Sequence, residues 1–221
     1  MELLKDAAQK SLAALRQKFT EETSSVTWQI TTVPCPAAVW GEEFNRKFLG
    51  ALLELPLGVQ RVDEEHGDII TSSHYGVLQS SGDQVRITCH PRSFHDAEYE
   101  KVEAINAQIM QKCGAVSETF SAYPGWEPDR QNPMLPVAHQ IYQELFSKPI
   151  VDYVMHAGVE CGIFYKKMPG LRMISIGPDL HYPHSPSEAL NIASTERFFR
   201  FLKTLIPASQ KTMYNSEAEG K

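Results

Sequence analysis

The chain has 221 residues, of which 42% are hydrophobic and 22% are charged, and its formal net charge is −6 at pH 7. This acidic balance argues against a general nucleic-acid-binding protein, which needs a basic surface. No apolar run approaches bilayer length, and the N-terminal sequence MELLKDAAQKSL alternates charged residues with Leu and Ala, unlike a signal peptide. We therefore expect a cytoplasmic globular protein with neither a nucleic-acid nor a membrane partner.

The cysteines of the chain are widely spaced and form no CxxC pair: Cys35, Cys89, Cys113 and Cys161. This spacing disfavours a thiolate zinc site and predicts reduced, mostly buried thiols. A cysteine nucleophile at Cys161, paired with His156 or His184, is a weak alternative, because nothing in the sequence marks this thiol as activated.

Hydrophobic periodicity divides the first part of the chain into helices and strands. Apolar residues that repeat at three and four predict helices, and runs of β-branched and aromatic residues predict strands. The expected helices cover 2–20, 42–55 and 96–112, and the expected strands cover 26–33, 68–79, 84–90 and 116–122. The short polar turn over 80–83 predicts a β-hairpin. This order is typical of an α+β layer, with helices on one face of a mostly antiparallel sheet.

A cluster of turn residues places a domain boundary near 123–133. Beyond it the pattern predicts alternating helices and strands, which favours parallel pairing. The expected elements are a helix over 134–146, a strand over 151–155, a short helix that begins near Glu160, a strand over 171–176 and a helix over 195–206 that ends at Pro207. Two strands make a thin sheet, so this part should dock onto something or belong to a larger domain. We expect the polar tail, 207–221, to be disordered.

Residues suited to chemistry gather in the stretch 151–188, at loops that follow the two expected strands. Ligands of open α/β sheets bind at such loops. His184 stands between Pro183 and Pro186, and this rigid presentation suits a zinc ligand. On local sequence alone a surface loop histidine is the more common case, and His181 is a competing candidate.

Four further side chains each have a functional and a structural interpretation. Glu160 could bind a substrate ammonium group or simply suit the N-terminus of a helix. Arg92, at a strand end, could clamp a carboxylate through two parallel hydrogen bonds, although an exposed strand-end arginine is commoner. His74 could face a cleft or solvent, and His156 is more often a structural histidine. The sequence has no P-loop, GxGxxG or GxSxG motif.

Five segments occur in an order that points to one family: LPLGVQR (55–61), TSSHYG (71–76), AYPGWEPD (122–129), HAGVECGIF (156–164) and ISIGPDLHYPHSPSE (174–188). Together they resemble the aminoacyl-histidine dipeptidases, which are cytosolic two-zinc enzymes. The resemblance runs from the first helix to about Ile206 and covers only the C-terminal half of such an enzyme. It implies an incomplete ferredoxin-like lid domain over 1–122, lacking its first strands. It also implies that 123–206 is the C-terminal α/β segment of the zinc-peptidase catalytic domain.

The resemblance also assigns roles to individual residues. It implies that His184, in the HSPxE motif, is the last zinc ligand of the family's two-zinc centre. Glu160 and the backbone of Gly158 are implied to bind substrate, and Arg92 fits the lid arginine that holds the substrate's carboxylate. His74 is a candidate contact in the lid, where the family usually has Asn.

A second departure from the family pattern is Ser187, where Asp is usual. The resemblance implies that the other zinc ligands, the bridging Asp and the general-base Glu lie upstream of the matched segment. No HxD motif precedes the lid in this chain. We therefore expect a fragment or one half of a split dipeptidase for Xaa-His substrates, with no catalytic residue of its own and inactive without its N-terminal catalytic half.

Two alternatives remain open. The chain could be a non-catalytic dimerisation or regulatory module derived from such a peptidase, forming a homodimer through the lid. It could also be an unrelated protein that uses the same loops to bind a carboxylate ligand.

Overall fold

The structure, a computed structural model, describes residues 2–19 and 26–219, with 211–219 described as backbone only. Its contacts divide the chain into two compact units, Met1–Glu43 and Phe44–Lys221, and each is described here by itself. The boundary expected near 123–133 falls inside the second unit and stays a prediction.

The first unit contains one helix and an irregular segment. Helix α1 spans Glu2–Lys18, with an acidic residue in its first turn and basic residues in its last, the order that suits the helix dipole. The Arg16 guanidinium donates to the carbonyl of Val26 over 3.2 Å. The strand expected over 26–33 is wrong, because this segment forms no ladder with any described strand. Its β-branched residues favour an extended backbone, but a strand also needs a partner.

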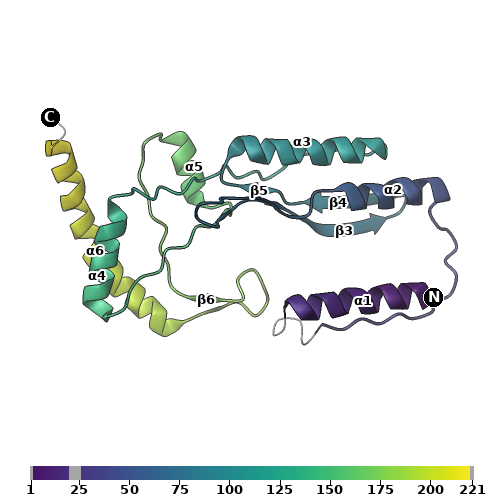
Figure 1. Cartoon of the computed structure of the whole chain (residues 1–221), viewed down its shortest axis with the longest axis horizontal. Coiled ribbons are helices and arrows are strands. Elements are labelled where there is room, and N and C mark those ends of the chain that lie inside the picture. The colour runs from purple at the N-terminus through teal and green to yellow at the C-terminus, as the bar shows by residue number, and fades with distance from the viewer. Residues whose placement is uncertain (1, 20–25, 220–221) are drawn as a thin grey trace. The chain divides into compact units, whose positions relative to one another are not determined.

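The first part of the second unit is an α+β layer (Figure 1). Strand β2 (Ile69–Ser73) pairs with β1 (Gly58–Val62) on one side and with β5 (Arg92–Ser93) on the other, both antiparallel. Strands β3 (Tyr75–Ser81) and β4 (Gln84–Cys89) form the predicted hairpin. The strand expected over 68–79 is therefore interrupted at His74, since its two halves pair with different neighbours.

Two helices pack together beside the hairpin. They are α2, Glu42–Glu54, and α3, Asp96–Lys112, close to the predicted bounds. Ala51, Leu55 and Ile109 form their shared core, and Cys89 of β4 packs against it. A mixed layer of helices and small sheets is thus confirmed, while the ferredoxin-like arrangement of the lid stays a prediction. The strand expected over 116–122 is wrong, because these residues have no partner strand and Val116 is 97% exposed.

The C-terminal part is built on α4 (Met134–Phe146) and α6 (Ile192–Glu219). Their core contains Ala138 and Ile141 from α4 and Phe201 and Leu205 from α6. Between these helices the chain forms α5 (Glu160–Lys167) and a minimal hairpin of β6 (Leu180–His181) and β7 (Ala189–Leu190).

The strands expected over 151–155 and 171–176 form no ladder with any described strand. Both segments have the composition of strands buried in a sheet, and such strands need neighbours on their edges. The described chain provides none, which is why the sequence pattern and the observed structure differ here.

Helix α6 begins earlier and ends later than predicted. Asn191 caps it, since the Asn191 side chain accepts from the Ser194 backbone N–H over 3.0 Å. The helix continues through Pro207 to Glu219, so the predicted end at Pro207 is wrong, while the expected disorder of the tail stays a prediction. One proline removes a single helical hydrogen bond, and the Ala, Gln, Lys and Glu residues that follow favour a helix. Residues 220–221 lie outside the described range. None of the described helices is both long and apolar enough to cross a membrane.

Candidate functional site

Strand ends of the α+β layer bring basic side chains together. Ser72 on β2 is opposite Arg92 on β5, and His74 follows β2 directly. The rings of His74 and His90 stack, with centroids 5.1 Å apart and planes 19° from parallel. The His90 backbone N–H donates to the His74 carbonyl over 2.7 Å. We call Ser72, His74, His90, Arg92 and His156 the histidine–arginine cluster.

His156 joins this cluster from a distant part of the sequence. Its Nε2 lies 2.7 Å from the Ser72 hydroxyl oxygen. Its ring meets Phe94 edge-on, with centroids 6.2 Å apart. These two contacts anchor the start of the 156–164 segment to the α+β layer, so His156 has a structural role here.

The electrostatics of the cluster favour neutral imidazoles beside one permanent cation. Burial lowers the pKa of His74, and the charges of His90 and Arg92 lower it further. Burial and then the Arg92 charge lower the pKa of His156. Arg92 is exposed, and its guanidinium makes no hydrogen bond or ion pair with another residue of the described ranges. A free guanidinium of this kind can receive a carboxylate through two N–H groups.

Gly158 lies directly against an aromatic side chain. A Cβ at this position would stand 2.7 Å from Cβ and 2.9 Å from Cγ of Tyr123, closer than side-chain atoms approach. Two nearby glycines make similarly close contacts. A Cβ at Gly125 would stand 1.9 Å from the Phe94 carbonyl oxygen, and a Cβ at Gly162 would stand 2.5 Å from the Pro124 carbonyl oxygen. These glycines let the backbone over 123–125 pass between the end of β5 and α5.

Asp96 holds the segment at Gly125 and the helix α5 in place, and the sequence did not reveal this role. Its carboxylate accepts from the Gly125 backbone N–H over 3.0 Å and pairs with the Lys166 ammonium over 2.8 Å. Chiefly because of Lys166, the pKa of Asp96 lies below its usual range. An acid in the first turn of a helix is common, so no local signal distinguished this one.

Glu160 is the first residue of α5 and is exposed. Its carboxylate makes no ion pair or hydrogen bond with another residue of the described ranges, so it is available to a ligand. Its place at the helix N-terminus also fits a purely electrostatic role. The structure leaves both interpretations of Glu160 standing.

His184 lies in the loop that β6 and β7 close. Its backbone has a positive φ of 62°, and its N–H donates to the Glu188 carboxylate over 2.7 Å. The loop is thus held by Glu188 as well as by its prolines. Figure 1 shows the β6 hairpin apart from β5 and α5. The structure therefore brings together His74, Arg92 and His156, which precedes Gly158, and the hydrogen bond described for His184 is with Glu188 of its own loop.

Within the described ranges, no group of three or more His, Cys, Asp or Glu side chains is arranged to hold a metal ion. A catalytic zinc site takes three protein ligands. The described residues supply only His184 from the HSPxE motif, so by themselves they do not fit a zinc ion.

The known proteins that this chain resembles are dipeptidases. No family model matches the chain. The chain is 31% identical over 207 residues to the cytosol non-specific dipeptidase of Escherichia coli (strain K12). This match covers 93% of this chain and 43% of the dipeptidase. The crystal structure of an aminoacylhistidine dipeptidase from Vibrio alginolyticus matches 94% of this chain and 42% of its own, with a TM-score of 0.72 and 28% identity. The chain is therefore similar in both sequence and fold to part of a dipeptidase.

These matches confirm the more particular resemblance to the C-terminal half of the aminoacyl-histidine dipeptidases. The chain spans less than half the length of the relatives that it matches.

Proposed function

We propose that the chain is part of a zinc-dependent dipeptidase that hydrolyses Xaa-His dipeptides, and that it supplies one zinc ligand and part of the substrate pocket. The similarity to an aminoacylhistidine dipeptidase supports the reaction class. The observation that carries the substrate role is the free guanidinium of Arg92 beside imidazoles whose pKa values are lowered. By analogy with the Escherichia coli relative, we place the protein in the cytoplasm.

The pocket residues match the two charged ends of a dipeptide. Arg92 binds the substrate's C-terminal carboxylate, and neutral His74 contributes a hydrogen bond beside it. The exposed carboxylate of Glu160 attracts the substrate's ammonium group, while the backbone at Gly158 lies alongside the peptide. Each group binds and orients the substrate, and none of them is proposed to be catalytic.

His184 is the proposed metal ligand of this chain. Because one imidazole does not make a zinc site, the other donors must come from the part of the dipeptidase relatives that this chain does not match. His184 would hold the metal together with donors from outside this chain, and a zinc ion bound there would supply Lewis-acid chemistry. The contribution of this chain is one imidazole on a loop held by Glu188.

Zinc content tests this proposal directly. The probe is the N-terminal part of the Escherichia coli dipeptidase that this chain does not match, added in trans. We expect the mixture to retain zinc through gel filtration and the chain alone to retain little. His184→Asn should reduce the retained zinc, because Asn tolerates the positive φ but removes the imidazole. His181→Asn, from the same loop, should leave it unchanged. Equal zinc contents for the two variants would contradict the assignment.

A non-catalytic dimerisation or regulatory module is the second candidate. The observation that favours it is the outer face of α2, where Leu49 is 57% exposed and Leu53 is 88% exposed. Apolar side chains in such positions can support a homodimer through the lid. Gel filtration of the chain distinguishes the two cases, because a module of this kind forms a stable dimer and gains no zinc-dependent activity from the added N-terminal part.

A further inference from the structure

The histidine–arginine cluster holds several bases and no acid. The side chains of His74, His90 and Arg92 are exposed, and none of them is hydrogen-bonded or ion-paired with an Asp or Glu of the described ranges. Other histidines of the chain do have such partners, at 2.8–2.9 Å: His66 with Asp63, His95 with Glu127 and His139 with Asp152. The cluster is therefore a concentration of basic groups without a carboxylate of its own.

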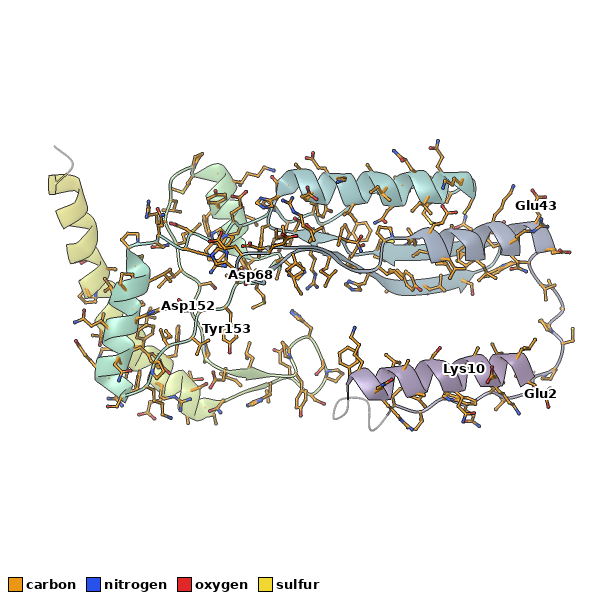
Figure 2. All side chains as sticks on the ribbon, viewed as in Figure 1. Glu2, Lys10, Glu43, Asp68, Asp152 and Tyr153 are labelled. Atoms are coloured by element: carbon orange, nitrogen blue, oxygen red, sulfur yellow. The ribbon has the colours of Figure 1, made fainter. Side chains whose placement is uncertain are left out.

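The acids next to these strand ends are paired with other cations. Asp68, labelled in Figure 2, directly precedes β2 and pairs with Arg130. Asp96, three residues after β5, pairs with the Lys166 ammonium over 2.8 Å. A ligand that carries negative charge would supply the partner that the bases of the cluster lack.

The electrostatics of the imidazoles agree with this. Burial lowers the pKa of His74, the charges of His90 and Arg92 lower it further, and no carboxylate of the described chain raises it. Burial and then Arg92 act on the pKa of His156 in the same direction. A bound anion would offset this repulsion, whereas a positively charged ligand would increase it.

The two stacked imidazoles present their Nε2 atoms to the same place. Their ring centroids lie 5.1 Å apart, and the His90 backbone N–H donates to the His74 carbonyl over 2.7 Å. A Cβ at Gly76 would stand 3.0 Å from Nε2 of His90 and 3.7 Å from Nε2 of His74, so both nitrogens lie beside one glycine. A side chain at this position would cover them, and Gly76 leaves them accessible.

The guanidinium and the imidazole pair suit two different groups of one ligand. Arg92 can donate two parallel N–H groups to both oxygens of a single carboxylate. The ring nitrogens of His74 and His90 then remain for a second acceptor, and an imidazole donates more strongly to a carboxylate than to a neutral group. A C-terminal aspartate or glutamate carries two carboxylates within one residue and so matches both parts of the cluster.

We propose that dipeptides with a C-terminal aspartate or glutamate are a further substrate class of the enzyme to which this chain belongs. Arg92 binds the α-carboxylate, and the stacked imidazoles of His74 and His90 bind the side-chain carboxylate. The role of Arg92 rests on the proposed function. The proposal goes beyond that function because it adds an acidic residue to the accepted substrates and makes His90 a residue that determines specificity.

The first test is binding to the chain alone, followed through the NMR signals of its imidazoles. The probes are N-acetyl-aspartate and N-acetyl-asparagine, which have nearly the same shape and differ in side-chain charge. We expect the aspartate probe to bind about fivefold more tightly, because a hydrogen bond to a charged acceptor is worth more than one to a neutral acceptor. The signals of His74 and His90 should shift, and that of His181 on β6 should not.

Substitution of His90 separates charge from shape. His90→Gln keeps a hydrogen-bonding side chain but removes the charge, so it should nearly abolish the preference for N-acetyl-aspartate. His90→Lys returns a positive charge and should recover most of the preference. His181→Gln is the matched control and should keep the full preference. Thermal unfolding of each variant verifies that the chain is folded.

Several results would overturn the proposal. Equal affinities for the two probes would do so, as would a preference that His90→Gln leaves intact or an absence of binding up to the solubility limit of both probes. Tighter binding of N-acetyl-histidine than of N-acetyl-aspartate would show that the imidazole pair stacks on an aromatic ring instead. Inorganic phosphate that binds as tightly as N-acetyl-aspartate would make the cluster a general anion site.

Hydrolysis in the presence of zinc and the N-terminal part of the Escherichia coli dipeptidase distinguishes this proposal from the proposed function. We expect a higher kcat/KM for alanyl-aspartate than for alanyl-asparagine, and a loss of this difference in His90→Gln. A chain that prefers N-acetyl-aspartate, in a mixture that hydrolyses no dipeptide, would refute the proposed function and support the acidic subsite. Hydrolysis of Xaa-His dipeptides with equal affinities for the two probes would refute the acidic subsite and support the proposed function.

Discussion

Arg92 carries the most specific expectation for a single side chain. In the complete enzyme, Arg92→Ala should raise KM for an Xaa-His dipeptide by about 10- to 100-fold, since a hydrogen bond to a charged group is worth about 1.5–3 kcal/mol. The change in kcat should be smaller, because the guanidinium binds the carboxylate throughout the reaction. Steady-state kinetics of the reconstituted enzyme measure both values.

Arg86→Ala is the matched control, since Arg86 is an exposed arginine on β4, the strand that precedes β5 in the chain. It should leave KM unchanged. If the two arginine variants behave alike, Arg92 has no special role in substrate binding.

The histidines of the cluster predict a pH dependence of stability. The pKa values of His74 and His156 lie below the ordinary value of 6.5, so the unfolded chain binds more protons than the folded one just below that pH. Stability is therefore full above pH 6.5 and falls as the pH drops through 6.5 towards the lowered values. Urea unfolding of the chain from about pH 8 to about pH 5 should show this loss.

His156→Gln should flatten the same profile, because glutamine does not titrate and can still hydrogen-bond to Ser72. His181→Gln, at an exposed position on β6, should keep the original slope. If stability depends on pH as steeply in the His156 variant as in the original chain, the lowered pKa of His156 does not contribute to the pH dependence.

Single residues differed in how far the sequence revealed them. Arg92 could be selected because an arginine at a strand end suggested a carboxylate clamp, and His74 because a histidine within the expected strand could face a cleft. Asp96 and His90 could not, because their roles depend on Lys166, Gly125 and the stacked ring of His74, which the fold brings from other segments.

Among the elements, the turn at Gly158 makes the sharpest stability prediction. Gly158→Ala would put a methyl group 2.7 Å from Cβ of Tyr123, and overpacking of this kind costs about 1–3 kcal/mol in free energy of unfolding. Gly177→Ala is the control, because its Cβ would meet nothing within 4 Å and its φ is not positive. Urea unfolding of both variants should show a loss only for Gly158→Ala. Equal stabilities would mean that the contact with Tyr123 is loose.

Helices and strands differed in how well the sequence predicted them. The bounds of α3 and α4 agree with the prediction, since helical hydrogen bonds form within the segment itself. The segments 151–155 and 171–176 have strand composition but no ladder in the described chain. Strand pairing depends on residues far away in sequence, and no local pattern shows whether they are present.

At the scale of the whole molecule, two observations support the proposal that the chain is part of a larger dipeptidase. The chain matches less than half of each dipeptidase relative. Its C-terminal part also presents an apolar row at Val151, Tyr153 and Met155 on segments without strand partners. The sequence analysis anticipated the second point from the small number of strands. The position of His184 relative to the cluster could not be predicted in that way, because it depends on how the remaining strands order the loop.

Zinc-dependent hydrolysis of β-alanyl-histidine by the purified chain, with and without the N-terminal part of the Escherichia coli dipeptidase, tests the central claim most directly. The account predicts turnover only when both polypeptides and zinc are present, and its loss when a chelator removes the metal. Zinc-dependent turnover by this chain alone would contradict the account, because it would require a complete metal site within these residues.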